Sequence, residues 1–264
     1  MAKTVCIVGA GPAGLVAAKT FLHDAQEGVF SVTVFDKQPR IGGLWPTSTD
    51  DGNGLVHPLM LTNQSKHSVA FSDLAWEDTS PQFPQAWQVG KYLERYLERY
   101  CSFEEGRFHL RLGWKVESAE PTEEGARWRV RVKSEDGVED DLSFDHLIIA
   151  TGFFGSPIIP DAIPENSVVP VLHSSQYRDI ESLLPNDGRG GKILVVGGQM
   201  SGVEIAGTIA THLSSVIHSP GTPSITSPEK YSVHHVIQRP IWVFPTFTSP
   251  AVKSSSGSLC VSVD

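Results

Sequence analysis

The sequence has few cysteines, few basic residues and no long apolar run, and each shortage excludes a class of protein. Its three cysteines among 264 residues form no C-x-x-C pair, which excludes a dithiol redox centre and a cysteine-rich scaffold. With 21 basic against 30 acidic residues the net charge is −9, so nucleic acid and anionic membranes are unsuitable partners. No apolar run approaches the roughly 18 residues of a membrane helix. We therefore expect a cytoplasmic protein with neither partner.

The chain begins with a pattern typical of dinucleotide-binding domains. Residues 3–22 predict a buried strand, a glycine turn and an Ala/Leu-rich helix, and residues 31–37 predict a second strand with Asp36 at its end. In the turn, Gly9 permits the tight bend, Gly11 lets a pyrophosphate approach the backbone, and Gly14 lets helix and strand pack closely. The helix N-terminus favours phosphate and the acid favours ribose hydroxyls. These residues predict FAD or NAD without choosing between them.

Residues 190–213 repeat the strand, glycine turn and helix, which suggests a second nucleotide-binding unit. Gly197 and Gly202 keep the turn and the close helix packing, but Gln199 stands where the middle glycine belongs. Gly198 beside it lets the loop shift. We expect a modified nicotinamide dinucleotide site in which Gln199 reaches a phosphate or ribose. An ordinary strand-to-helix turn is the alternative.

The choice between NAD and NADP depends on the residues that end the next strand. Residues 214–220 predict a short strand that ends in neither an acid, which would favour NAD, nor an arginine, which would accommodate the 2′-phosphate of NADP. The nearest cations are Lys230 and Arg239, and Arg239 is the better candidate because it sits at the end of a strand-like run. The residues therefore permit NADP but do not require it.

The segments between the two loops predict one helix and several strands. Residues 89–103 predict an amphipathic helix with Tyr92, Tyr96 and Tyr100 on one face. Residues 114–120 and 126–133 predict a hairpin, and residues 141–152 predict a single buried strand running into Thr151-Gly152. His234 and His235 fall on opposite faces of a strand, and no cluster has metal-ligand spacing.

Three further segments carry a family resemblance: "QPRIGGLW" (38–45), "HPLMLTNQSKHSVAFSDLAW" (57–76) and "FPQAWQVGKYLERY" (83–96). In this order and spacing they resemble the flavin-containing monooxygenases, particularly the fungal members. The family's linker fingerprint, F-x-G-x-x-x-H-x-x-x-Y/F, is kept at His173 and Tyr177, whereas Ser167 and Val169 replace its Phe and Gly. The resemblance covers residues 3 to about 247.

The resemblance implies an α/β fold of two Rossmann-like three-layer domains, with the NADPH domain inserted into the FAD domain. We expect an FAD domain at 1–155 that is incomplete at its C-terminus, an NADP domain at 156–247 and a disordered tail at 248–264. The implied reaction is reduction of FAD by NADPH, capture of O2 as a flavin hydroperoxide, and oxygenation of a small molecule at a soft nitrogen or sulfur. The alternatives are an NADPH oxidase or reductase and a non-catalytic nucleotide-binding remnant. Exposed core at the incomplete edge leaves self-association open.

The resemblance also implies site residues. Asn63 would lie at the reactive edge of the flavin, since a neutral amide holds a peroxide without delivering a proton; a turn-capping side chain is the plain alternative. His173 would position the domains for hydride transfer. The residues expected along the two cofactors are Gly9, Gly11, Pro12, Ala13, Gly14, Asp36, Lys37, Gly43, Leu44, Trp45, Thr151, Gly152, His173, Tyr177, Gly197, Gly198, Gln199, Ser201, Gly202 and Arg239.

Overall fold

The structure is a computed structural model of the chain. It describes residues 2–26, 28–51, 55–101, 106–122, 125–161, 163, 167–181, 183–184, 187–220 and 224–239. The chain divides into two compact units, unit 1 (Met1–Ile159) and unit 2 (Pro160–Asp264).

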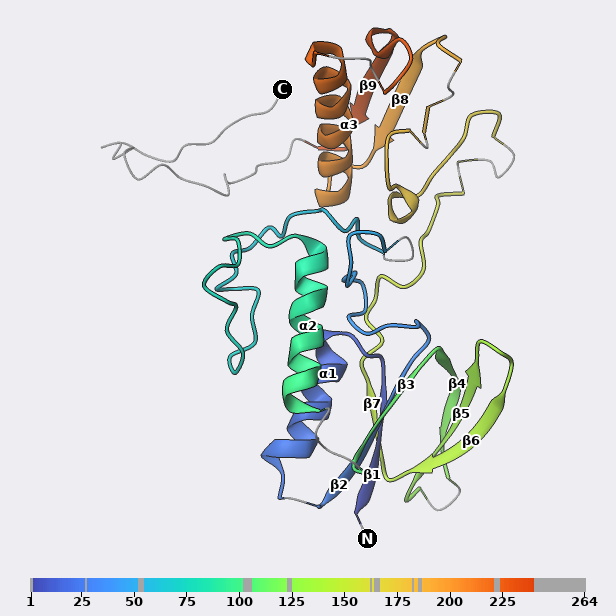
Figure 1. Ribbon diagram of the computed structural model, residues 1–264. Coiled ribbons are helices and arrows are strands. Elements are labelled where there is room, and N and C mark those ends of the chain that lie inside the picture. Colours follow the sequence, from blue (N-terminus) through green and yellow to red (C-terminus); the bar gives the residue numbers. More distant parts are fainter. Residues whose placement is uncertain are drawn as a thin grey trace. The chain divides into compact units, whose positions relative to one another are not determined.

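Unit 1 is built on a parallel sheet of four strands in the order β3-β2-β1-β7 (Figure 1). The strands are β1 (Lys3–Val8), β2 (Phe30–Asp36), β3 (Phe108–Leu112) and β7 (His146–Ile149). Helix α1 (Pro12–Lys19) and a π-helical turn, η1 (Thr20–Asp24), connect β1 to β2. Because β1 and β2 are parallel neighbours, their carboxyl ends bring the first glycine loop and Asp36 to one edge of the sheet.

Two layers cover this sheet, one on each face (Figure 1). Helices α1 and α2 (Ala86–Tyr100) pack on the face that carries Ile7 and Val34. An antiparallel sheet covers the other face, where Val130 and Val132 meet Cys6 and Phe35. Its strands are β4 (Trp114–Pro121), β5 (Trp128–Ser134) and β6 (Glu139–Phe144). Successive strand residues point to opposite faces, so the unbroken apolar run of β1 supplies both layers. The predicted α/β class and the predicted hairpin are confirmed.

Helix α2 begins three residues before the predicted start. Gln85 is the N-cap, and the side chains of Gln85 and Gln88 bond each other's backbone N–H groups in a capping box. The predicted apolar face is correct: Tyr92 and Tyr96 are buried, with Leu93 between them. The helix ends at Tyr100, and the last two predicted helical residues lie outside the described residues.

The single buried strand predicted at residues 141–152 is wrong. The chain leaves β6 at Phe144 and turns before β7, where the Asp145 carboxylate accepts hydrogen bonds from the Thr4 N–H (2.7 Å) and hydroxyl (2.9 Å). These bonds hold the pKa of Asp145 below its usual range. Strand β7 is the edge of the described sheet, and Ile149 is 64% exposed. An apolar run alone cannot distinguish such an edge strand from a central one.

Unit 2 contains two parallel strands, β8 (Gly191–Val196) and β9 (Tyr231–Val236), with helix α3 (Met200–His218) between them in the chain. Two 3-10 turns precede these strands, η2 (Ser174–Gln176) and η3 (Pro228–Lys230). The strand predicted at 214–220 is wrong, because α3 continues to His218 and packs Ile209, Leu213 and Val216 at helical spacing against the unit's core.

The second strand of this unit is therefore β9, which begins three residues before the strand-like run predicted from residue 234 and ends before Arg239. Insertion of one domain into the other remains a prediction. The predicted tail at 248–264 lies outside the described residues. Among the helices of the described ranges, none is both long and apolar enough to span a membrane.

Candidate dinucleotide-binding site

The two glycine loops have the same backbone geometry, although they lie in different units. Gly9 and Gly197 open the loops with φ of +111° and +130°, a region that side chains disfavour. A Cβ on Gly14 would lie 1.8 Å from the Gly9 carbonyl oxygen, and a Cβ on Gly202 would lie 1.9 Å from the Gly197 oxygen. Each unit thus needs its first and third glycines for the turn and for the close approach of the helix.

The middle position has no such requirement. Gly11 is the N-cap of α1 with φ −78° and ψ −175°, and Gln199 is the N-cap of α3 with φ −89° and ψ 179°. Both are extended conformations that any residue adopts. The expected shift of the loop at Gly198 is therefore unnecessary, because Gln199 fits the geometry of a glycine loop unchanged. Its side chain is exposed and makes no capping bond to α3 within the described residues.

The first turn of each helix can bind an anion. In the described structure Gly11 has no side chain to cap α1, the Gln199 side chain makes no capping bond to α3, and Pro12 at the first helical position of α1 has no N–H of its own. The N–H groups of Ala13 and Gly14 in α1, and of Ser201 and Gly202 in α3, lie in the first turn, where no earlier helical carbonyl can accept them. Such groups favour phosphate.

The first glycine of each loop bonds to the strand beside it, and these bonds show which residues of β2 and β9 correspond. The Gly9 N–H donates to the Phe35 carbonyl (2.7 Å), and the Gly197 N–H donates to the Val236 carbonyl (3.0 Å). The residue after Phe35 is Asp36, and the residue after Val236 is Ile237. Unit 2 therefore has no acid at the ribose position, and Arg239 follows two residues later, exposed. Lys230 precedes β9 and donates to the Gly188 carbonyl (3.0 Å), so it lies at the opposite end of the strand.

Asp36 holds the first loop as well as ending β2. One carboxylate oxygen accepts the Ala10 N–H (2.7 Å), and the other accepts the Gln38 N–H (2.9 Å). Each oxygen keeps a further lone pair, so the side chain can still accept a ribose hydroxyl. The neighbouring Lys37 ammonium lies beside Gly155.

The Gly-Gly-Leu-Trp segment packs against the first loop. The Gly42 N–H donates to the Ala10 carbonyl (2.9 Å), and Gly43 lies against Gly11: a Cβ on Gly43 would be 3.2 Å from the Gly11 Cα. Two bare backbones thus face each other at the helix N-terminus, which is the cradle that a pyrophosphate group requires. Leu44 and Trp45 are half-buried, and Trp45 contacts the core. The predicted residues of this half of the site come together.

Asn63 lies on an exposed turn that is fixed at both ends. Before it, Thr62 is buried, and its N–H donates to the Pro84 carbonyl (2.9 Å). After it, the Lys66 ammonium donates to the carbonyls of Glu77, Asp78 and Ser80 at 3.2, 3.0 and 2.9 Å.

Helix α2 anchors both of these segments. The Ala86 N–H donates to the Met60 carbonyl (2.8 Å), and Gly90 packs so closely on Pro46 that a Cβ there would lie 1.9 Å from the Pro46 oxygen. The start of α2 therefore joins the residues before Asn63 to the residue after Trp45. The sequence signal of this role is the glycine in an otherwise regular helix, which commonly marks close backbone approach.

The remaining predicted residues are more scattered. Thr151 and Gly152 are exposed after β7, near the first loop, because the Ala150 carbonyl abuts Gly9. In unit 2, His173 caps η2: its Nδ1 accepts the Ser175 N–H at 3.2 Å. Tyr177 is buried in the unit 2 core with Ile209 and Leu213, and burial raises its pKa.

The two adjacent histidines point to opposite faces of β9, as predicted. His234 lies 3.2 Å from the hydroxyl of Ser232 on its own face, and His235 Nε2 lies 2.8 Å from the Gly197 carbonyl. His235 is therefore a contact of the second loop. Among the described residues no group of three His, Cys, Asp or Glu side chains has metal-binding geometry. Cys6 and Cys101 are buried free thiols, and Cys260 lies outside the described ranges.

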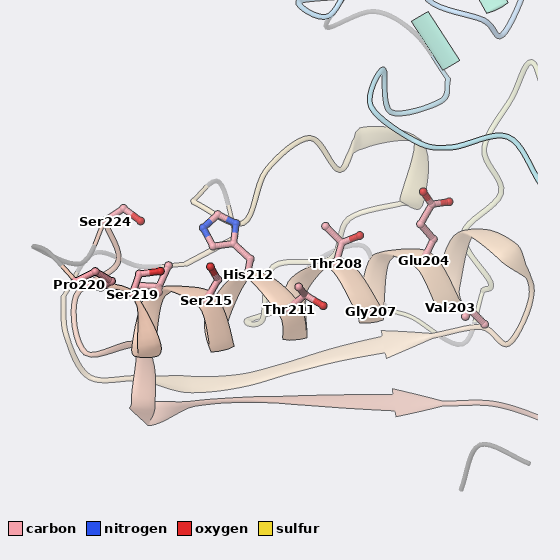
Figure 2. Close-up of a pocket in the computed structure, with 11 residues that line it drawn as sticks. Val203, Glu204, Gly207, Thr208, Thr211, His212, Ser215, Ser219, Pro220 and Ser224 are labelled. Atoms are coloured by element: carbon pink, nitrogen blue, oxygen red, sulfur yellow. The ribbon is translucent and has the colours of Figure 1, made fainter. Parts of the chain in front are cut away.

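A groove of about 800 Å³ follows the side of α3 in unit 2 (Figure 2). Most of its lining side chains are small or carry hydroxyls, with Glu204 near one end and Ser224 near the other. Burial raises the pKa of Glu204. None of the predicted cofactor residues is among the described residues that line it. The groove therefore follows α3 from Val203 onward, and the predicted residues Ser201 and Gly202 are not among its described lining residues.

Comparison with known proteins gives the family. The model described as "FMO-like: Flavin-binding monooxygenase-like" matches residues 2–226. A monooxygenase named ptmN of Penicillium ochrochloron is 32% identical over 76% of this chain and 31% of its own length. The rat protein named dimethylaniline monooxygenase [N-oxide-forming] 4 is 30% identical over 82% of this chain and 37% of its own length.

Among solved structures, the S-allyl-L-cysteine S-oxygenase from Allium sativum superposes with a TM-score of 0.64 at 22% identity. The superposition covers 97% of this chain and 54% of the oxygenase chain. This chain spans about a third to a half of the length of these proteins. On the match of the family model, the chain belongs to the flavin-binding monooxygenase-like family.

Proposed function

We propose that the chain binds FAD at the loop of unit 1 and NADPH at the loop of unit 2. The complete enzyme would transfer one oxygen atom of O2 to a soft nitrogen or sulfur of a small molecule. The observation that carries this proposal is the matched geometry of the two loops in a chain of a flavin-binding family. One chain with two loops of this kind has places for two dinucleotides. Residues 1–155 and 156–247 are the proposed FAD and NADP domains.

The residues of unit 1 suit FAD. The N–H groups of the first turn of α1 would bind the pyrophosphate, which the facing backbones of Gly11 and Gly43 admit. Asp36 would accept a ribose hydroxyl with the lone pairs that its backbone bonds leave. When bound, the flavin supplies the redox chemistry: it takes electrons from the nicotinamide and passes them to O2.

The residues of unit 2 favour NADP over NAD. Ile237 replaces the acid that would bind the ribose hydroxyls and repel a 2′-phosphate, and Arg239 supplies a guanidinium two residues later. Gln199, exposed at the N-cap of α3, would donate its amide N–H to a phosphate or ribose oxygen. His173 and Tyr177, from the family fingerprint, would position unit 2 for hydride transfer.

The proposed substrate class follows the relatives. The rat protein is named for forming N-oxides, and the garlic structure is that of an S-oxygenase. Asn63 would serve either reaction, because its neutral amide can hydrogen-bond a reactive oxygen without protonating it. The fixed turn on which Asn63 lies supports a positioned role rather than a mobile one.

The test is to mix purified chain, loaded with FAD, with NADPH anaerobically and then to admit air with an amine or sulfide present. We expect the flavin absorbance to bleach and then return with formation of the oxygenated product. Return with stoichiometric H2O2 and no product would favour the oxidase alternative. A chain that does not retain flavin, or whose flavin NADPH does not bleach, would contradict the proposal for this chain and favour a non-catalytic nucleotide-binding protein.

A further inference from the structure

Arg40 occupies the centre of the segment that packs on the first glycine loop. Its Nη1 lies within hydrogen-bond distance of the carbonyl oxygens of Ile41 (3.0 Å), Gly43 (3.2 Å) and Trp45 (2.9 Å). Its Nε lies 2.5 Å from Asp51. Only 16% of the Arg40 side chain and 10% of the Asp51 side chain are exposed. The segment therefore folds around a buried cation.

The turn that Arg40 holds is one that the backbone does not favour by itself. Gly42 and Gly43 have successive positive φ values of +102° and +62°. Besides Arg40, two backbone bonds hold this turn: the Gly42 N–H donates to the Ala10 carbonyl, and the Trp45 N–H donates to the Gly42 carbonyl (3.1 Å). Glycine loses the most conformational freedom on ordering, so a turn with two glycines needs an external constraint. A guanidinium that gathers several carbonyls provides it.

We propose that Arg40 is a positioning residue for the flavin. By fixing the turn from Ile41 to Trp45, it sets the distance between the bare backbones of Gly43 and Gly11, where the pyrophosphate is proposed to lie. This inference rests on the proposed function for its flavin part. Arg40 also has a further buried nitrogen, Nη2, with no hydrogen-bond partner in the described part of the chain. The planar guanidinium can serve Asp51 and the turn at once, through Nε and Nη1, whereas a lysine has a single nitrogen for both.

That difference defines the experiment. Arg40→Lys keeps a positive charge for the buried Asp51 but removes the planar guanidinium with its several N–H donors. Arg40→Met removes both the charge and the donors. Arg111→Met is the matched control, because Arg111 is a partly buried arginine of unit 1 that lies on β3, outside the glycine turn, and its Nη1 pairs with Asp140 at 3.3 Å. For each variant we would measure the unfolding temperature without FAD, amide hydrogen exchange at Gly42 and Trp45, and FAD affinity by flavin fluorescence.

We expect Arg40→Lys to unfold near the wild-type temperature, to exchange the Gly42 and Trp45 amides faster, and to bind FAD about 10-fold to 100-fold more weakly. Arg40→Met should show the same changes with a lower unfolding temperature, and Arg111→Met should match the wild type in exchange and FAD affinity. If Arg40 served only to neutralise Asp51, Arg40→Lys would restore FAD affinity, which would overturn the inference. If the Gly42 and Trp45 amides of Arg40→Met exchanged at the wild-type rate in the absence of FAD, that result would also overturn the inference. A wild-type chain that binds no FAD would instead contradict the proposed function.

Discussion

Two glycines of the first loop should respond differently to the same substitution, Gly→Ala. A Cβ on Gly14 would lie 1.8 Å from the Gly9 oxygen, whereas ordinary contact begins near 3.4 Å, so α1 and the turn must separate by 3.4 − 1.8, about 1.6 Å. Overpacking of this kind costs about 1–3 kcal/mol or more. A Cβ on Gly11 would lie 3.6 Å from the Gly43 Cα, already an ordinary contact, and its φ of −78° suits any residue. The free energy of unfolding should then change by about 0.5 kcal/mol or less.

FAD affinity should reveal the effect of Gly11→Ala that its stability does not. The methyl group of Gly11→Ala would occupy the gap that the pyrophosphate is proposed to use, so we expect a correctly folded protein that binds FAD about 10-fold to 100-fold more weakly. Urea unfolding followed by circular dichroism, with FAD titration by fluorescence, measures both quantities. The reasoning is refuted if Gly11→Ala destabilises as much as Gly14→Ala, or if it binds FAD like the wild type.

Four further predictions concern other parts of the chain. Arg239→Ala should weaken NADPH binding about tenfold and leave NADH binding unchanged, since only NADPH carries the 2′-phosphate; equal losses for both nucleotides, measured by calorimetry, would contradict the role of Arg239. Burial raises the pKa of Cys6 to about 12, so in a variant with Cys101 and Cys260 replaced by serine the native thiol should not react with a disulfide reagent at pH 8. The pKa of Cys6 is higher in the folded than in the unfolded state, so its contribution to stability should be constant below the unfolded value near 9 and fall as the pH rises towards 12. A free energy of unfolding that does not change over this pH range in the same variant would contradict this prediction. Asn63→Ala should keep FAD reduction by NADPH and increase release of H2O2, and an unchanged peroxide yield would remove Asn63 from the reaction.

The sequence was sufficient for the first half of the site because its signals are local. Gly9, Gly14 and Asp36 each have a role set by the backbone within one strand-turn-helix unit, and the structure has the geometry that the motif requires. The helix at Ala86–Tyr100 was predictable for the same reason, since its apolar face repeats at helical spacing.

The rest depended on contacts between distant residues. Residues 214–220 contain the β-branched pair Val216 and Ile217, which suggested a strand, yet Val216 packs against the unit 2 core as part of α3, which continues to His218. That error moved the end of the second strand and hid the correspondence of Ile237 with Asp36. Arg40 gave no signal at all, because a single arginine after a strand is ordinary until its three carbonyl partners are seen.

The central claim is that the two loops hold two different dinucleotides, and the stoichiometry of binding tests it most directly. Calorimetric titration of the purified chain with FAD, and then of the FAD-loaded chain with NADP, should give one site for each. Gly11→Ala should weaken only the first site and Arg239→Ala only the second. Binding of a single dinucleotide, or loss of both sites in either variant, would contradict the account.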